Sequence, residues 1–291
     1  MFGVLAVNKP AGLTSRDCVN RVQRLIKPCK VGHAGTLDPL ATGVLVLCIG
    51  RATRLVEFVQ QQDKLYRGTF LLGRSSPTED TEGEITQLEN PPVPTREEID
   101  AVIPEFTGSI QQVPPIFSAL KVKGERSYRL AREGKEVKLE SRTIQIDELQ
   151  VVSYDYPNLV LDIKCGSGTY VRSLGRDVAR RLGTEAVMSA LVRTGIGSYS
   201  LESACALDDI SLDTLPSLMV PAVTAVAHLP VLELDDDAIE EIRNGRPLEN
   251  ESKSTAERIA AVDKDGRLLA VLAPHRGEFL KPLRNFTTVY Q

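Results

Sequence analysis

The chain has 291 residues, of which 42% are hydrophobic and 25% charged, and its formal net charge is −4. This composition is typical of a folded globular protein, and no window holds the roughly 18 apolar residues that a membrane helix needs. The length favours one large domain plus a small one, or two unequal domains. The first positive charge, Lys9, follows the initial apolar run, which is the reverse of a secretory signal. We therefore expect a buried first strand and a cytoplasmic protein.

The cysteines indicate neither a disulfide framework nor a metal site. None of the five is spaced as C-x-x-C, and only three histidines could join them as ligands. We expect reduced thiols and no bound metal. The cysteines are Cys18, Cys29, Cys48, Cys165 and Cys205.

The negative net charge conceals a strong segregation along the chain. Residues 1–74 carry 11 Lys/Arg and 4 Asp/Glu, and residues 106–200 carry 14 and 10. Residues 75–105 carry one Lys/Arg and nine Asp/Glu, and residues 201–250 carry two and eleven. Because local potential steers a polyanion to its site, an acidic protein with two basic blocks remains a candidate for RNA binding.

In the first third of the chain, hydrophobic spacing predicts a helix, a loop and two strands. Thr14 or Ser15 can cap a helix that ends before Pro28. Residues 32–43 form a polar, glycine-bearing loop, and the apolar run 44–49 predicts a buried strand. Residues 51–61 are spaced as a helix. Residues 65–72 alternate as a strand, with Tyr66 and Phe70 on one face, and residues 74–95 are acidic, Pro-rich and expected to be a loop.

In the later part of the chain, residues 159–165 alternate as a strand that residues 166–169 interrupt. A helix follows, so Tyr170 and Arg172 fall at its start, beside the partial positive charge of the helix N-terminus. Residues 229–286 have the turns of a small, mostly β unit. We place a domain boundary near Ala227, which divides the chain into residues 1–227 and 228–291.

One carboxylate, two tyrosines and one arginine form a set that could act chemically on a nucleobase. They are Asp38, Tyr66, Tyr170 and Arg172. Taken singly, a loop acid is usually a turn former, a tyrosine is core and an arginine is surface. Together, an arginine can keep the acid ionised, while a tyrosine can stack on a base and transfer a proton. The chain lacks a G-x-S-x-G elbow and the glycine-rich motifs of nucleotide cofactors. The residues therefore indicate an enzyme that handles bases or RNA.

Several motifs then point to one family. Residues 32–43 read GHAGTLDPLATG and resemble the central motif of the TruB pseudouridine synthases, in which the Asp is catalytic. Further matches follow in the order that the family uses: NKPAGLTS at 8–15, Tyr66, PPIFSALKVKG at 114–124, GTYVR at 168–172 and Arg193 with Thr194. The resemblance covers about residues 3–200, and the C-terminal unit is loosely similar to the PUA-like domain of bacterial members.

The resemblance implies an α+β fold with a mixed, largely antiparallel central sheet, flanking helices and a small β-rich PUA-like C-terminal domain. It implies isomerisation of the uridine at position 55 in the TΨC arm of tRNA, whose N1 glycosidic link is exchanged for a C5 link. The base must be flipped into a pocket. We expect no cofactor and no metal, tRNA as the partner, no guide RNA and no membrane contact, and a monomer.

The resemblance also assigns roles to individual residues. Asp38 is the essential carboxylate, acting at C1′ or C2′ of the ribose, and Arg172 pairs with it. Tyr66 stacks on the flipped base and is the candidate for the proton transfer at C5, while Tyr170 lines the pocket. His33 fills the space that the base leaves or stacks within the loop, unless it is a hydrogen-bonded structural histidine.

Other residues are expected to support or bind the substrate. Lys9 is placed in this group mainly as a support of the catalytic loop. Residues 118–142 contain eight Lys/Arg and fit phosphate contacts, although a solvated helix with ion pairs is the alternative. The basic residues predicted to bind substrate are Lys121, Arg132 and Arg193.

Two other functions stay open. A guide-RNA-dependent synthase of the archaeal and eukaryotic type would carry an N-terminal extension and a fuller PUA domain. A non-catalytic RNA-binding or tRNA-folding module would not need Asp38, Tyr66 and Arg172 together. Product formed on a tRNA transcript by the protein alone separates these alternatives.

Overall fold

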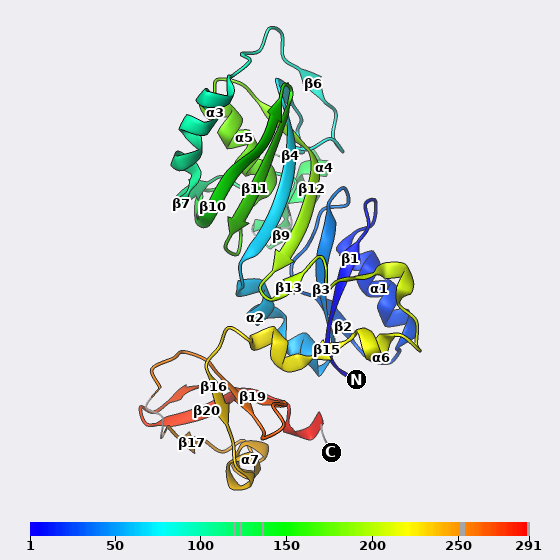
Figure 1. Ribbon diagram of the computed structural model, residues 1–291, viewed down its shortest axis with the longest axis vertical. Helices are drawn as coiled ribbons and strands as arrows, with labels where there is room; N and C mark the ends of the chain where they lie inside the picture. Colours follow the sequence, from blue (N-terminus) through cyan, green and yellow to red (C-terminus); the bar gives the residue numbers. More distant parts are fainter. Residues whose placement is uncertain (119, 123, 136, 251–253, 290–291) are drawn as a thin grey trace. The chain divides into compact units, whose positions relative to one another are not determined.

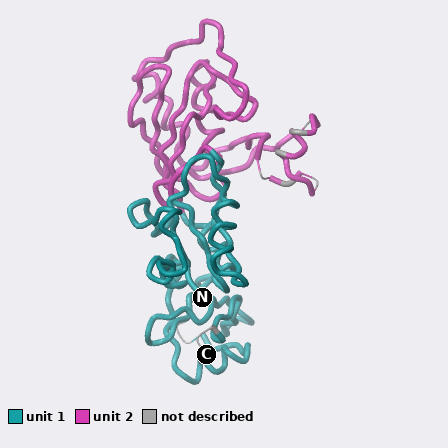
Figure 2. The backbone as a smooth tube through the Cα atoms, turned by 90° about the vertical axis from the view of Figure 1, so that its right-hand side faces the viewer, with its two compact units in different colours: residues 1–39, 44–62, 196–291 teal, residues 40–43, 63–195 magenta. Residues whose placement is uncertain are grey.

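The structure is a computed structural model that describes residues 1–118, 120–122, 124–135, 137–250 and 254–289. The chain forms two compact units (Figure 2). Unit 1 comprises residues 1–39, 44–62 and 196–291, and unit 2 comprises residues 40–43 and 63–195. Among the described residues, no helix has the length and apolar character needed to cross a membrane.

Unit 1 contains short helices and two groups of strands. Its helices are α1 (Ser15–Leu25), α2 (Val56–Gln61), α6 (Leu215–Leu218) and α7 (Asp236–Arg243), with the 3-10 helices η1 (Arg51–Leu55), η3 (Leu207–Asp209), η4 (Ala222–Val226) and η5 (Thr287–Val289). Its first group of strands is β1 (Phe2–Lys9), β2 (Val31–His33), most of β3 (Thr42–Gly50), β13 (Tyr199–Ser200), β14 (Cys205–Ala206) and β15 (Val220–Pro221). The second is β16 (Val231–Glu233), β17 (Leu248–Glu249), β18 (Ile259–Val262), β19 (Leu268–His275) and β20 (Phe279–Asn285).

Strands β1 and β3 form the centre of the first sheet of unit 1. They are neighbours, and β1 also pairs parallel with β14 and antiparallel with β15. Strand β2 pairs antiparallel with β3, where Val31 lies opposite Ile49. The side chains of residues 44–49 are fully buried. The buried strand predicted from this apolar run is therefore confirmed.

Helix α1 begins at the predicted cap. The hydroxyl of Thr14 accepts a hydrogen bond from the N–H of Asp17, and the Asp17 carboxylate accepts one from the N–H of Thr14, which forms a capping box. The helix ends at Leu25, shortly before Pro28. Its buried face includes Val19 and Val22, as the spacing predicts.

The C-terminal strands form a separate sheet in the order β16-β18-β19-β20-β17. Strand β16 runs parallel to β18, and the other neighbours are antiparallel. One face of this sheet shares a hydrophobic core with β1 and β3, and the ring of Phe286 stacks on that of Phe2 at 5.0 Å. This shared core explains why these strands belong to unit 1. The domain boundary near Ala227 stays a prediction.

Unit 2 is built around one long sheet. Its strands are β4 (Lys64–Leu72), β5 (Arg74–Ser75), β6 (Thr86–Gln87), β7 (Gly108–Gln112), β8 (Lys121–Val122), β9 (Glu125–Arg126), β10 (Arg142–Asp155), β11 (Asn158–Cys165) and β12 (Ala186–Ile196). Its helices are α3 (Arg96–Val102), η2 (Ile103–Phe106), α4 (Ser127–Arg132) and α5 (Val171–Arg181). Strands β12, β4, β11, β10 and β7 are neighbours in that order (Figure 1).

Helix α5 packs closely on strand β4 of this sheet. Strand β4 alternates as predicted, with Gly68, Phe70 and Leu72 buried. A Cβ atom at Gly175 of α5 would lie 2.1 Å from the ring of Phe70, so only glycine permits this approach. The predicted strand 159–165 is also confirmed within β11. The acidic segment 74–95 contains the short pair β5 and β6, whereas a loop without strands was predicted.

The predicted fold class is confirmed. The sheets are mixed: the pairs β4 with β11, β10 with β11 and β7 with β10 are antiparallel, whereas Thr42 and Gly43 of β3 pair parallel with Val192 and Arg193 of β12. Gly43 has a φ of +98°, and a Cβ there would lie 2.3 Å from the carbonyl oxygen of Arg193. Glycine is therefore required where β3 meets β12.

Candidate active site

In unit 1, residues 34–39 form the loop that carries Asp38, here called the Asp38 loop. It follows β2, and its start is held where the N–H of Ala34 donates to the carbonyl oxygen of Val46 on β3. Leu37 is buried, and its N–H donates to the hydroxyl of Ser15 at 2.8 Å, while that hydroxyl donates back to the Leu37 carbonyl at 3.2 Å. Asp38, directly after this contact, is partly exposed.

Lys9 holds the other side of the Asp38 loop. This side chain is fully buried, and its ammonium group donates to the carbonyl oxygens of Pro10, Leu13 and Pro39 at 2.9, 2.6 and 3.2 Å. The N–H of Gly12 donates to the same Pro39 carbonyl at 2.8 Å. The two chain neighbours of the aspartate are therefore tied to separate parts of unit 1, which fixes the backbone at the carboxylate. A direct contact of Lys9 with substrate stays a prediction.

In unit 2, Tyr66 lies on β4 opposite Ile163 of β11 and is partly buried. Two residues earlier, Lys64 is buried and lies opposite Cys165 in the same register. Burial lowers the pKa of the Lys64 ammonium to about 8, and the positive charge of Arg193 acts in the same direction. A buried lysine with a pKa well below its usual range therefore lies two residues before the predicted active-site tyrosine.

Tyr170 is the N-cap residue of α5, as the sequence predicts. The side-chain amide of Gln112 accepts a hydrogen bond from the backbone N–H of Tyr170 at 2.9 Å and donates one to the backbone carbonyl oxygen of Tyr170 at 3.1 Å. The guanidinium of Arg142 lies over the Tyr170 ring at 4.7 Å and donates to the carbonyl oxygen of Gly168. The backbone and the ring of Tyr170 are thus held by different strands, β7 and β10.

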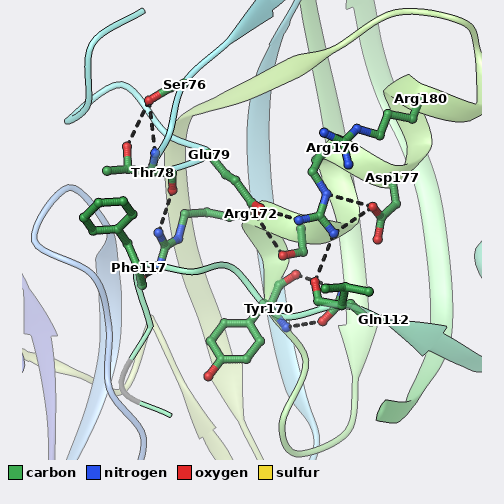
Figure 3. Close-up of polar contacts among 12 residues, drawn as sticks. Ser76, Thr78, Glu79, Gln112, Phe117, Tyr170, Arg172, Arg176, Asp177 and Arg180 are labelled. Carbon is green, nitrogen blue, oxygen red and sulfur yellow. Dashed lines mark hydrogen bonds and ion pairs between the residues drawn. The ribbon is translucent and has the colours of Figure 1, made fainter. Parts of the chain in front are cut away.

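Arg172 is the second residue of α5 and is 7% exposed. Its guanidinium donates to the carbonyl oxygens of Thr78 at 2.7 Å and Phe117 at 3.0 Å (Figure 3). Its charge is balanced by the buried carboxylate of Asp80 at 3.4 Å. These contacts fix the side chain in unit 2. The predicted pairing of Arg172 with Asp38 stays a prediction.

The other four predicted substrate-binding residues lie on four different elements. His33 ends β2 and is partly buried, and Arg193 lies on β12 and is 1% exposed. The backbone of Lys121 lies in β8 and that of Arg132 ends α4, but their side chains lie outside the described part. Residues 118–142 are not one solvated helix, because the described segment contains the β8–β9 hairpin before the short α4.

Sequence reasoning predicted that Lys9 supports the Asp38 loop, but it missed the residues that hold Tyr170 and Arg172. Asp80, Gln112 and Arg142 were not singled out, although each contacts Arg172 or Tyr170. For Asp80 the signal was an acid in an acidic segment, which is also the signal of an ordinary loop.

Within the described ranges, no group of three or more His, Cys, Asp or Glu side chains could hold a metal ion, and all five cysteines are free thiols.

Solved structures and known sequences give the class of the protein. The fold resembles that in "Crystal Structure of a Cbf5-Nop10-Gar1 Complex" with a TM-score of 0.76 and 25% identity, covering 95% of this chain and 79% of that one. This is the pseudouridine synthase fold with a C-terminal β domain. Residues 23–171 match the family described as TruB family pseudouridylate synthase (N terminal domain), and residues 229–287 match tRNA Pseudouridine synthase II, C terminal.

Sequence relatives extend the match over nearly the whole chain. The tRNA pseudouridine synthase B of Bacillus cereus is 38% identical over 98% of this chain and 97% of its own. That of Bacillus pumilus is 39% identical over 97% of this chain and 96% of its own. The chain belongs to the TruB family of pseudouridylate synthases and is an isomerase.

Proposed function

We propose that this protein isomerises the uridine at position 55 in the TΨC loop of tRNA, without a guide RNA. Its similarity over nearly full length to proteins named tRNA pseudouridine synthase B supports tRNA as the substrate. The observation that carries the mechanism is the fixed backbone on both sides of Asp38, where Leu37 and Pro39 are each hydrogen-bonded to other parts of unit 1.

In the proposed reaction Asp38 acts on the ribose of the target uridine, either by attack at C1′ or by removal of a proton at C2′. The N1–C1′ bond breaks, the base turns, and a C5–C1′ bond forms. The hydrogen on C5 then leaves as a proton and N1 gains one, so substrate and product contain the same atoms. No external oxidant or reductant is needed for this exchange. A carboxylate held by rigid backbone suits it, because effective catalysis requires the reacting atoms to be held in place.

Tyr66 is proposed to stack on the flipped base and to move the final proton from C5. Its place on β4, between the buried Lys64 and Gly68, supports a fixed ring position. Tyr170, held by Gln112 and Arg142, is proposed to line the same pocket, and Arg172 is proposed to pair with Asp38. Flipping the base costs a few kcal/mol, which stacking and hydrogen bonds in the pocket recover.

Contacts with the tRNA backbone are proposed for Lys121, Arg132 and the other basic residues of 118–142. Arg193 is proposed to bind substrate from its buried place on β12, and His33 to occupy the space that the flipped base vacates. Residues 228–291 are proposed as a small PUA-like RNA-binding domain, supported by the family match at 229–287. We also propose that the protein acts as a monomer in the cytoplasm.

The test is to incubate the purified protein with an unmodified tRNA transcript and to map pseudouridine by chemical probing. We expect complete conversion at position 55 without added RNA and none in a transcript with cytidine at that position. A requirement for a second RNA would instead support a guide-dependent synthase. Tight tRNA binding without product would support a non-catalytic RNA-binding module.

A further inference from the structure

Arg176 lies one helical turn beyond Arg172 on α5 and bridges the same two segments of unit 2. Its guanidinium donates to the carboxylate of Glu79 (Figure 3). It also donates to the carbonyl oxygen of Val113 at 3.0 Å. A third contact, at 2.8 Å, goes to the adjacent Asp177. Arg172 contacts the same segments at Thr78 and Phe117. The two arginines, on successive turns of α5, therefore both connect residues 78–80 with residues 113–117.

Glu79, whose carboxylate accepts from Arg176, is next in the chain to two partners of Arg172. It lies between Thr78 and Asp80, both of which contact the Arg172 guanidinium. The backbone of Glu79 has a φ of +63°, a left-handed conformation that is unusual for a residue with a side chain and needs surrounding contacts to hold it. The Glu79 backbone thus joins two partners of Arg172, while its carboxylate is held by Arg176.

The contact between Glu79 and Arg176 is largely removed from water. The side chain of Arg176 is 9% exposed and that of Glu79 is 13% exposed. The hydroxyl of Ser173 donates to the second carboxylate oxygen of Glu79 at 2.8 Å. Burial raises the pKa of Glu79, whereas Arg176 and Ser173 lower it by favouring the charged form. Buried charges need both partners, because loss of one leaves the other uncompensated.

We propose that Glu79 and Arg176 are positioning residues that hold the Arg172 guanidinium in its working position. The inference rests on the proposed function, in which Arg172 acts on Asp38. Neither Glu79 nor Arg176 needs to contact the tRNA. They act by fixing the two segments whose carbonyl oxygens, with Asp80, surround Arg172.

The test compares Glu79→Gln with the control Glu185→Gln in single-turnover reactions on tRNA. Glu185 also accepts from an α5 arginine, Arg180 at 2.9 Å, but this pair is more exposed. We expect Glu79→Gln to slow pseudouridine formation about ten- to a hundredfold, because a small misplacement of an active-site group has an effect of this size. Binding of tRNA should stay within about threefold of wild type, and Glu185→Gln should match wild type.

A purely structural role is excluded by combining Glu79→Gln with Arg172→Lys. If Glu79 acts through Arg172, the double variant is no slower than Arg172→Lys alone. If the two effects multiply, or if Glu79→Gln reacts at the wild-type rate, the positioning proposal is wrong. If Arg172→Lys itself reacts at the wild-type rate, the proposed role of Arg172 fails first and the positioning proposal with it.

Folding is checked by thermal unfolding of each variant. Should Glu79→Gln not fold, Arg176→Lys replaces it, since lysine keeps the charge but cannot reach Glu79 and Val113 together through one planar group. The same slow turnover with near-normal tRNA binding is expected for Arg176→Lys. Wild-type turnover by this variant would overturn the proposal.

Discussion

The ammonium group of Lys9 donates a hydrogen bond of 3.2 Å to the carbonyl oxygen of Pro39, the residue that directly follows Asp38. The same group also donates to two carbonyl oxygens of residues 10–13 and has no exposed surface. The end of the first strand thereby fixes the backbone beside the proposed catalytic carboxylate. This contact gives a physical reason for a fully buried lysine at the end of the first strand.

Replacing Lys9 with methionine should therefore impair turnover more than tRNA binding. Methionine fills much of the same space but leaves the carbonyl oxygens of Pro10 and Leu13 without this donor, while that of Pro39 keeps only the N–H of Gly12. Each buried unsatisfied group costs about 1–3 kcal/mol. We expect a clear loss of stability in urea unfolding and at least a tenfold slower single-turnover reaction. Unchanged turnover would show that the position of the Asp38 loop does not depend on this contact.

Lys64 should make stability depend on pH. Burial lowers its folded-state pKa to about 8, below its value of 10.5 when exposed. Between these values the unfolded chain binds more protons, so the contribution of Lys64 to stability rises with pH, by at most about 3 kcal/mol. Urea unfolding at pH 8 and pH 10 should show this rise in wild type relative to Lys64→Met. The control is Lys281→Met, at an exposed lysine on β20, which should keep the wild-type dependence.

Local signals in the sequence predicted much of the fold. The alternation of β4 and β11 identified both strands, and Thr14 identified the start of α1, because these patterns depend on neighbours in the chain. The approach of Gly175 to Phe70 was not predictable, since it joins residues about a hundred positions apart. Periodicity states which face of an element is buried but not what it packs against.

In the candidate active site too, local motifs were predictable and long-range contacts were not. The family motifs predicted Asp38, Tyr66, Tyr170 and Arg172 as site residues and Lys9 as a support of the Asp38 loop, but not the residues that hold Tyr170 and Arg172. The contact of Arg172 with Thr78 spans 94 positions. Thr78 and Phe117 both contribute backbone carbonyl oxygens, which leave no trace in side-chain type. An acidic, Pro-rich segment such as residues 74–95 predicts a loop, whether or not one of its acids, here Asp80, is buried against an arginine.

Two substitutions of Tyr66 distinguish proton transfer by its hydroxyl from stacking by its ring. If its hydroxyl moves the final proton, Tyr66→Phe should bind tRNA and stack on the base but release almost no pseudouridine. If the ring only stacks, Tyr66→Phe should be nearly silent and Tyr66→Leu should lose about 1–3 kcal/mol of stacking. Single-turnover product formation and tRNA binding, measured for both variants, decide between the roles. A Phe variant at the wild-type rate removes Tyr66 as the proton-transfer residue.

Binding of tRNA should weaken steeply with salt despite the net charge of −4. Residues 1–74 and 106–200 hold an excess of basic side chains, and each phosphate contact contributes a slope near one in a log–log plot of affinity against salt. Titrations between about 50 and 200 mM salt measure this slope. An affinity that does not change over this range would contradict a basic surface that follows the RNA backbone.

The most direct test of the account is the single-turnover rate of Asp38→Asn on unmodified tRNA. Asparagine keeps the shape of the side chain but removes its charge, so the fixed loop should persist while the reaction on the ribose is lost. We predict no detectable pseudouridine, with tRNA affinity within a few-fold of wild type. A variant that retains more than about a tenth of the wild-type rate would contradict catalysis centred on Asp38.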